Sequence, residues 1–306
     1  MVRKIFFLFL ILPMLSLAQV KVAGRVLDGV TKKPIPYVNF ENFSAQLGTQ
    51  ANEHGVFELN LPMGKITDTI FVSCIGYKRL AISNLKPNHM TIELTPLVFQ
   101  LSEVKISNKK PKIVEVGVLK KSGVKSNTHS FQIPGTQSAV YLANNSYEQA
   151  YLKEIFFFIG DDMYDAPFRI HIRENDKGIP GKDLIEKNIE FAANRKNAWN
   201  SFDLTVYNLL MPENGLWVSV EWIKNEKYKK VVTLNVNYPD GSKKPWSYTY
   251  YGPEILTRFD SSFGLAYRKF LGGNWTKKGG QRRGVLDKNW RDANTDLMIK
   301  GILEVY

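Results

Sequence analysis

The sequence contains very little cysteine. Cys74 is the only cysteine among 306 residues, so no intramolecular disulfide can form. Small disulfide-stapled scaffolds are therefore excluded, and a chain of this length can stabilise itself by burying a core instead. Because Cys74 lies among alternating apolar residues and no activating neighbour is evident, we predict a packed core thiol.

Familiar catalytic signatures are missing as well. There is no G-x-S-x-G elbow, no phosphate-binding glycine loop and no H-E-x-x-H motif. His171-x-x-Glu174 matches half of a zinc-peptidase motif, but residues three apart on a strand point to opposite faces, and no histidine follows His171. We therefore predict a surface histidine and a glutamate at a strand end. The cluster Asp161-Asp162-x-x-Asp165 lacks the spacing of a calcium loop, and a solvated turn is favoured over a metal site. No catalytic residue, metal or cofactor is predicted.

Long apolar runs are confined to the N-terminus. Arg3 and Lys4 precede an apolar run over residues 5–15, and Ser16-Leu17-Ala18 places small residues where a signal peptidase cleaves. The run is shorter than the roughly 20 residues that a membrane-spanning helix needs. We predict a signal peptide over residues 1–18 and export to the periplasm, the outer membrane or the cell surface.

Acidic residues are outnumbered by basic ones. The chain has 41 lysines and arginines against 29 acidic residues, a net charge of +12, and removal of Arg3 and Lys4 leaves +10. This balance favours anionic partners, although export argues against nucleic acid. Lysines concentrate within residues 97–135, which we interpret as a solvated basic linker, with contact to an anionic envelope surface as the alternative.

Short strand patterns make up most of the remaining sequence. From Val20 to Val26, apolar residues alternate with polar ones, as a half-buried strand requires. Six further short apolar segments follow up to residue 94, separated by turn sequences such as Asn52-Glu53-His54-Gly55. Seven short strands with regular turns predict a β-sandwich or barrel over residues 19–96.

Several motifs within these strands have a familiar order. They are Val22-x-Gly24-x-Val26-x-Asp28, the run KPIPYV over residues 33–38, Gly48-Thr49-x-x-Asn52-x-x-Gly55-x-Phe57-x-Leu59, and Ile75-Gly76-Tyr77. In this order they resemble the carboxypeptidase regulatory-like domain. The resemblance implies a transthyretin-like sandwich of the type common in cell-envelope proteins of the Bacteroidetes.

The chain differs from both well-known settings of that family. In metallocarboxypeptidases the domain follows a zinc peptidase domain, which this sequence lacks. In TonB-dependent receptors it precedes a TonB-contacting segment, a plug and a large barrel, for which too little chain remains. Residues 101–106 (LSEVKI) resemble the receptors' segment, but we favour a strand or linker over a TonB contact.

Residues 136–306 again show strand patterns and predict an all-β protein with a second sandwich, for which the jelly roll is the candidate topology. Phe168, Ile170 and Ile172 alternate with Arg169, His171 and Arg173, which predicts one buried and one solvated face. Trp246, Tyr248 and Tyr250 share one strand face, where they either pack in the core, the favoured interpretation, or form a ligand platform. A loop with Trp275, Arg282 and Arg283 is the other candidate binding surface.

These observations favour a non-enzymatic binding or assembly module of the cell envelope, with a glycan or an envelope protein as its partner. One alternative is a secreted hydrolase of peptide or polysaccharide, whose site would be assembled from distant residues of the second domain. Another is a structural subunit of an outer-membrane complex, which predicts a large exposed apolar patch.

Overall fold

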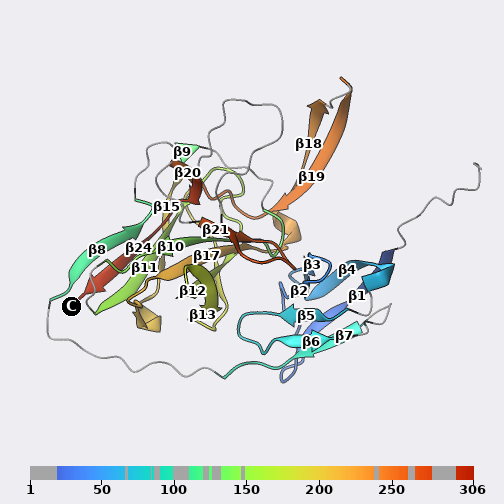
Figure 1. Ribbon diagram of the computed structural model, residues 1–306, viewed down its shortest axis with the longest axis horizontal. Coiled ribbons are helices and arrows are strands. Elements are labelled where there is room, and N and C mark those ends of the chain that lie inside the picture. Colours follow the sequence, from blue (N-terminus) through green and yellow to red (C-terminus); the bar gives the residue numbers. More distant parts are fainter. Residues whose placement is uncertain are drawn as a thin grey trace, which may run out of the picture.

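The computed structural model describes residues 19–65, 68–83, 85, 90–98, 110–119, 124–125, 132–145, 149–237, 241–260, 266–277 and 294–306. The predicted signal peptide, residues 101–106 and the two arginines Arg282 and Arg283 lie outside these ranges. The described chain is all-β, and its strands form two packed domains from which a two-stranded ribbon projects (Figure 1). None of the helices in these ranges is long and apolar enough to cross a membrane.

The first domain is a sandwich of two small sheets. One sheet has the order β4-β1-β7 and the other the order β3-β2-β5-β6. Their strands are β1 (Gln19–Asp28), β2 (Asn39–Asn42), β3 (Leu47–Gln50), β4 (Val56–Pro62), β5 (Ile70–Ser73), β6 (Leu80–Ile82) and β7 (Met90–Leu94), with a 3-10 turn η2 (Met63–Lys65) after β4. The sandwich predicted for this part of the chain is confirmed.

Two motif glycines explain local features of this sandwich. A Cβ on Gly24 would collide with the backbone of Met90, because β1 and β7 pair in parallel at this point. Gly55 has a φ of 70°, which suits the turn between β3 and β4 and favours glycine. The apolar side chains of these strands then fill one core, in which Phe40 and Phe57 stack with ring centroids 4.0 Å apart.

The second domain is a larger sandwich of antiparallel pairs. One sheet has the order β13-β12-β17-β10-β21-β22, with β14 on β12, and the opposite sheet has the order β15-β11-β24-β8, with β16 on β11. The first sheet contains β10 (Gln137–Leu142), β12 (Phe168–Asp176), β13 (Ile179–Asp183), β14 (Ile189–Phe191), β17 (Leu216–Trp222), β21 (Ala266–Lys269) and β22 (Thr276–Lys277). The second contains β8 (Lys112–Gly117), β11 (Ala150–Ile159), β15 (Ala198–Asp203), β16 (Leu209–Leu210) and β24 (Ile299–Val305).

Two smaller sheets and two short 3-10 turns complete this domain. The sheet β23-β20-β9 consists of β9 (Val124–Lys125), β20 (Thr257–Asp260) and β23 (Asn294–Leu297), and the turns are η4 (Thr205–Tyr207) and η5 (Glu226–Tyr228). The ribbon consists of β18 (Lys229–Asn237) and β19 (Lys243–Tyr251). The sandwich is confirmed, and a jelly-roll connection of its strands stays a prediction.

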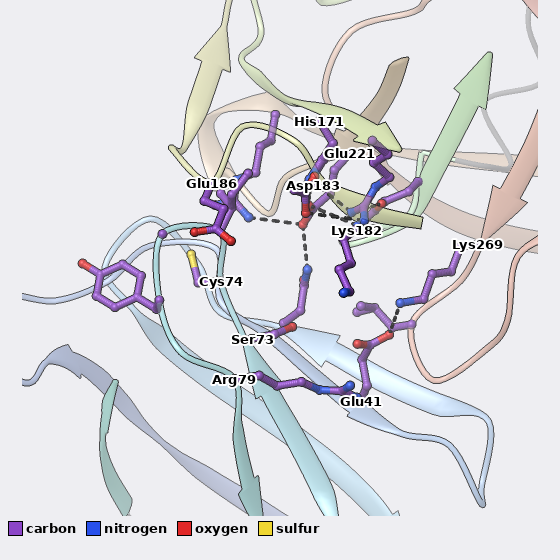
Figure 2. Close-up of a pocket in the computed structure, with 18 of the residues that line it drawn as sticks. Glu41, Ser73, Cys74, Arg79, His171, Lys182, Asp183, Glu186, Glu221 and Lys269 are labelled. Carbon is purple, nitrogen blue, oxygen red and sulfur yellow. Dashed lines mark hydrogen bonds and ion pairs between the residues drawn. The ribbon is translucent and has the colours of Figure 1, made fainter. Parts of the chain in front are cut away.

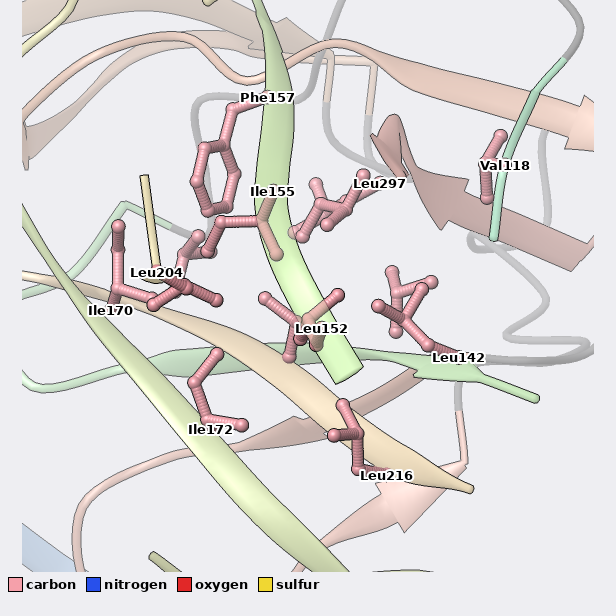
Figure 3. Packing of buried hydrophobic residues seen from close by; sticks show 14 of the residues in the cluster. Val118, Leu142, Leu152, Ile155, Phe157, Ile170, Ile172, Leu204, Leu216 and Leu297 are labelled. Atoms are coloured by element: carbon pink, nitrogen blue, oxygen red, sulfur yellow. The ribbon is translucent and has the colours of Figure 1, made fainter. Parts of the chain in front are cut away.

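The core of the second domain lies between its two large sheets. Ile155 and Phe157 of β11 face Ile170 and Ile172 of β12, and all four are fully buried (Figure 3). Phe157 also meets Phe168 edge to face, with ring centroids 5.1 Å apart. The predicted alternation on β12 therefore sends its apolar residues into this core, as expected.

The predicted basic linker over residues 97–135 is partly wrong. Residues 112–117 form β8, which pairs antiparallel with β24 and so belongs to the second sandwich. Val116 is buried in its core, and Val114 packs against it. Val114, Val116 and Val118 occupy alternate positions, which is a strand pattern that the surrounding lysines obscured in the sequence.

Candidate functional site

A polar pocket lies where the two domains meet. It has a volume of about 420 Å³ and is lined by β2 and the β5–β6 connection of the first domain and by β12, β13, β17 and β21 of the second. Charged side chains from both domains point into it (Figure 2). A pocket of this size between domains is typical of small-molecule binding sites.

Glu221 of β17 forms the centre of the pocket floor and is completely buried. From the first domain, Asn39 donates a hydrogen bond to it at 2.9 Å and Gln50 donates another at 2.7 Å. From the second domain, Arg169 pairs with the same oxygen at 3.4 Å. Burial raises the pKa of Glu221, but the charge of Arg169 and the hydrogen bond from His171 outweigh it and lower the pKa to about 2. The carboxylate is therefore charged, and it joins the two domains.

His171 of β12 bridges two carboxylates. Its Nε2 lies 2.7 Å from Glu221 Oε2, and its Nδ1 lies 2.9 Å from Asp183 Oδ1 and 3.2 Å from Arg173 Nη2. Each ring nitrogen therefore lies within hydrogen-bond distance of a carboxylate oxygen. Burial raises the pKa of Asp183, but the charges of His171 and Arg173 together lower it below its usual value. His171 therefore links Glu221 to Asp183, and both of its ring nitrogens are engaged within the protein.

The predicted surface position of His171 is wrong. His171 and Arg169 are 4% and 1% exposed, because the first domain covers the face of β12 that was expected to be solvated. Glu174, the other residue of the half motif, accepts a hydrogen bond from the backbone of Lys182 at 3.2 Å. The described residues contain no group of three or more side chains that could hold a metal ion.

Sequence reasoning missed Glu221, although one signal was available. It is the one charged residue of β17, whose other residues are apolar apart from Ser219, and every residue of this strand is buried. A carboxylate within such a strand needs charged or hydrogen-bonding partners, since an unpaired buried charge is very costly. The sequence does not reveal that these partners come from 182 and 171 residues away, at Asn39 and Gln50.

The rim of the pocket is richer in cations than the floor. Lys269 pairs with Glu41 at 2.9 Å, and the backbone of Gly272 donates to the same carboxylate at 3.3 Å. Arg79 lies over the ring of Phe71 at 4.0 Å, and Lys182 projects from β13. Arg79 and Lys182 are exposed, and within the described ranges neither forms an ion pair with a carboxylate.

Cys74 lies in the wall of the pocket and is 7% exposed. Burial raises the pKa of its thiol, and the charge of Arg169 only partly opposes this. A thiol in this setting is largely protonated at neutral pH and is a poor nucleophile. The position of Cys74 in the core cluster agrees with the packed thiol predicted from the sequence.

The aromatic face of β19 lies away from the pocket, on the projecting ribbon. Tyr250 is 3% exposed, Tyr248 is half-buried and Trp246 is 46% exposed, so burial declines from the base of the ribbon toward its tip. The ring centroids of Trp246 and Tyr248 are 5.1 Å apart, and those of Tyr248 and Tyr250 are 6.1 Å apart. The core position favoured for these residues therefore fits Tyr250 but is wrong for Trp246, because no described segment covers the outer ribbon.

Trp275, the remaining described member of the predicted binding residues, is half-buried near β22. The guanidinium of Arg173 lies 5.7 Å from the centre of its ring. Arg282 and Arg283 lie outside the described residues. Within the described residues, Trp275 lies beside Arg173 of β12 and not on the aromatic face of β19, so these two candidate surfaces are separate.

The structure defines a two-domain β-sandwich protein with a polar pocket at the domain interface. Residues 22–128 match the family model described as the CarboxypepD_reg-like domain. The N-terminal domain is therefore a carboxypeptidase regulatory-like domain, as its motifs indicate. The match continues through β8, which the structure places in a sheet of the second domain. No curated protein matches the sequence.

Three solved structures show slight similarity to this chain. The clostridial cysteine protease Cwp84 after propeptide cleavage has 11% identity and a TM-score of 0.35, over 66% of this chain and 42% of that one. The cysteine protease and lectin-like domains of Cwp84 from Clostridium difficile have 11% identity and a TM-score of 0.33, over 67% and 38%. A DUF3823 family protein from Bacteroides ovatus has 8% identity and a TM-score of 0.20, over 78% and 98%. The chain spans less than half of the length of the first two proteins.

Proposed function

We propose that this protein is a non-enzymatic module of the cell envelope that binds another envelope protein through the β18–β19 ribbon. The observation that carries the proposal is the exposed apolar face of the ribbon. Trp246 and Leu234 are directly opposite each other on the two strands and are 46% and 47% exposed. Val232, Val236 and Tyr248 share their face, which extends the apolar patch along both strands. A contiguous apolar patch that projects from a protein favours a macromolecular partner.

The edges of the ribbon support a protein partner in particular. Within the part of the chain that the structure describes, no third strand pairs with β18 or β19. A two-stranded ribbon has only marginal stability in water, and its free backbone groups can pair with an added strand. A protein partner that adds a strand would pair the free backbone groups at the edge of the ribbon, and it would also cover the apolar face.

The base of the ribbon is fixed to the second domain. The hydroxyl of Tyr250 donates to Asp162 at 2.6 Å, and the ammonium of Lys230 contacts the same carboxylate. The backbone of Tyr251 donates to the carbonyl of Gln132 at 2.9 Å. The ribbon is therefore held in a defined direction, as an arm that presents its outer half to a partner requires (Figure 1).

The envelope location in this proposal rests on the predicted signal peptide and on the family of the first domain. The non-enzymatic role rests on the state of the reactive side chains in the pocket. Both ring nitrogens of His171 face carboxylates, and the Cys74 thiol has a raised pKa. A hydrolase would need a free base or an activated nucleophile at such a place.

A glycan is the second candidate for the ribbon, because three aromatic rings lie in a row on β19. Sugar rings stack on aromatic faces, but binding sites for sugars also supply polar groups that fix orientation. Here the same face carries the aliphatic residues Val232, Leu234 and Val236, and the hydroxyl of Tyr250 is already bound to Asp162. These neighbours favour a protein surface over a glycan.

The test replaces Leu234 with a photo-crosslinking amino acid in the full chain, expressed in its native host. We expect one discrete crosslinked envelope protein, and we expect it to disappear when Trp246→Ala is added. The matched control places the same crosslinker at Val206, an apolar residue that is 74% exposed outside the ribbon, and should give no such product. Equal products from both positions, or a product insensitive to Trp246→Ala, would contradict the proposal. If no protein is crosslinked but the protein binds glycans on an array, and this binding requires Trp246, the glycan alternative would replace the protein-partner proposal.

A further inference from the structure

The interdomain pocket carries a proposal that is independent of the ribbon. We propose that it binds a small organic carboxylate between Arg79, Lys182 and Lys269 at its rim. The ligand is about the size of one sugar or amino-acid residue, which fits a pocket of about 420 Å³.

The excess of positive charge in the lining is the first observation that favours an anionic ligand. Among the described lining residues, five side chains are cationic, Arg79, Arg169, Arg173, Lys182 and Lys269, and four are carboxylates, Glu41, Asp183, Glu186 and Glu221. With His171 left uncounted, this described lining therefore has a net charge of +1. A concave site of one sign concentrates ligands of the other sign.

The distribution of these charges places the excess at the rim. On the floor, Glu221 is compensated by Arg169 and His171, and Asp183 by His171 and Arg173. At the rim, Glu41 already holds Lys269, and the exposed Glu186 forms no ion pair within the described ranges. Arg79 and Lys182 remain without a carboxylate among the described residues, and Figure 2 shows both pointing into the part of the pocket that contains the Lys269–Glu41 pair.

The setting of Arg79 indicates a planar anion. The central carbon of its guanidinium lies 4.0 Å from the ring centre of Phe71 and 5.4 Å from that of Phe43, so cation–π contacts hold the group in place. The N–H groups of a stacked guanidinium point outward along its edge, where they match the two oxygens of a carboxylate. Lys182 and Lys269 then supply point charges from the opposite domain, so the ligand would contact both domains at once.

Glu186 separates charge attraction from a merely structural effect. It is an exposed carboxylate of the same lining and has no ion pair within the described ranges. Its removal by Glu186→Gln should strengthen the binding of an anion or leave it unchanged, whereas Arg79→Gln and Lys182→Gln should weaken it. All three side chains are exposed, so the folded structure should tolerate each change.

Two sources share the proposed carboxylate chemistry, an acidic sugar and the carboxyl end of a peptide. Isothermal titration calorimetry of the full mature chain would use glucuronate and N-acetylalanine as separate probes, with glucose and inorganic phosphate as comparisons at equal ionic strength. We expect at least one organic carboxylate to bind with a dissociation constant of about 1 mM or lower, and glucose not to bind. The probe that binds identifies the source.

The variants decide whether binding occurs at this site. Arg79→Gln and Lys182→Gln should each weaken the bound carboxylate about tenfold. Lys21→Gln on β1, an exposed lysine outside the pocket lining that pairs with Glu58, should leave binding unchanged. Binding of neither carboxylate, binding of phosphate alone, equal loss in Lys21→Gln, or weakening by Glu186→Gln as large as by Lys182→Gln would each overturn the proposal.

Discussion

Strands β12 and β19 are both nine residues long, and they differ in what covers their faces. β12 presents the charged residues Arg169 and His171, which are almost completely buried, whereas β19 presents Trp246, which is 46% exposed. The first domain covers the charged face and supplies Asn39 and Gln50 to the central Glu221. No described segment covers the aromatic face. Burial therefore follows from the partner that a face meets, and polarity alone does not decide it.

This difference has energetic consequences for each region. A buried charged network is tolerated when its members are paired and hydrogen-bonded, and it makes the docking of the two domains specific more than it makes it strong. An exposed apolar ribbon contributes little to folding and is costly unless a partner covers it. The interface should therefore be sensitive to the loss of one charge, and the ribbon should tolerate the loss of a large side chain.

The largest expected effect concerns the centre of the interface. Glu221→Ala should lower the free energy of unfolding by about 3–5 kcal/mol, because it leaves the buried guanidinium of Arg169 without its carboxylate and His171 without the partner of its Nε2. Urea denaturation measures this change. Glu115→Ala, which breaks a partly exposed pair with Lys300, is the control and should cost about 0–1 kcal/mol. Equal costs would show that the interface network is as solvated as a surface pair.

Acid should lower the free energy of unfolding through the interface network. The pKa of Glu221 falls from 4.5 to about 2 in the folded protein, so its contribution is complete above the unfolded pKa and is lost as the pH falls toward 2. A shift of this size corresponds to about 3 kcal/mol. The depressed pKa of Asp183 adds a loss of the same sign. Unfolding measured from pH 6 to pH 2 should show this loss in the wild type and a weaker one in Glu221→Gln. The same dependence of the unfolding free energy on pH in both proteins would contradict the assignment of the acid loss to Glu221.

The contrast also shows how much of the fold the sequence predicts. The strands of the first domain are predictable because their signals are local, as in the alternation of β1 and the turn that requires Gly55. The alternation of β12 is likewise correct. Its environment is not predictable, because the covering residues Asn39 and Gln50 are more than a hundred residues away in the chain.

The candidate site was less predictable than the fold for a related reason. The cations of the rim come from separate strands and loops of both domains, and no spacing in the sequence connects Arg79 with Lys182 or Lys269. Trp246 and Tyr248 were recognised as a shared face, since this needs only alternate positions on one strand. Whether that face is covered depends on tertiary structure.

A smaller effect is expected where the ribbon joins the second domain. Tyr250→Phe should cost about 1–2 kcal/mol, because it removes a 2.6 Å hydrogen bond from the hydroxyl to the charged Asp162. Tyr248 lies two residues closer to the tip on the same strand. Tyr248→Phe removes a hydroxyl for which the described residues provide no hydrogen-bond partner, and should cost less than about 0.5 kcal/mol. Thermal denaturation of the two variants under the same conditions would measure the difference. An equal cost would mean that the base of the ribbon is not anchored through Asp162.

The smallest effect is expected at the exposed end of the aromatic row. Trp246→Ala should change the free energy of unfolding by less than about 1 kcal/mol, because nearly half of the side chain already contacts water. Trp222 of β17 is 2% exposed, and Trp222→Ala should cost about 3–5 kcal/mol by leaving a cavity. Fluorescence provides a second readout, since Trp246→Phe should remove the emission that an aqueous quencher reaches most readily, while Trp222→Phe should remove a protected component. A cost for Trp246→Ala that approaches that of Trp222→Ala, together with protection from the quencher, would mean that the ribbon face is packed within the protein. The contrast with β12 would then disappear, and with it the surface on which the partner-binding proposal rests.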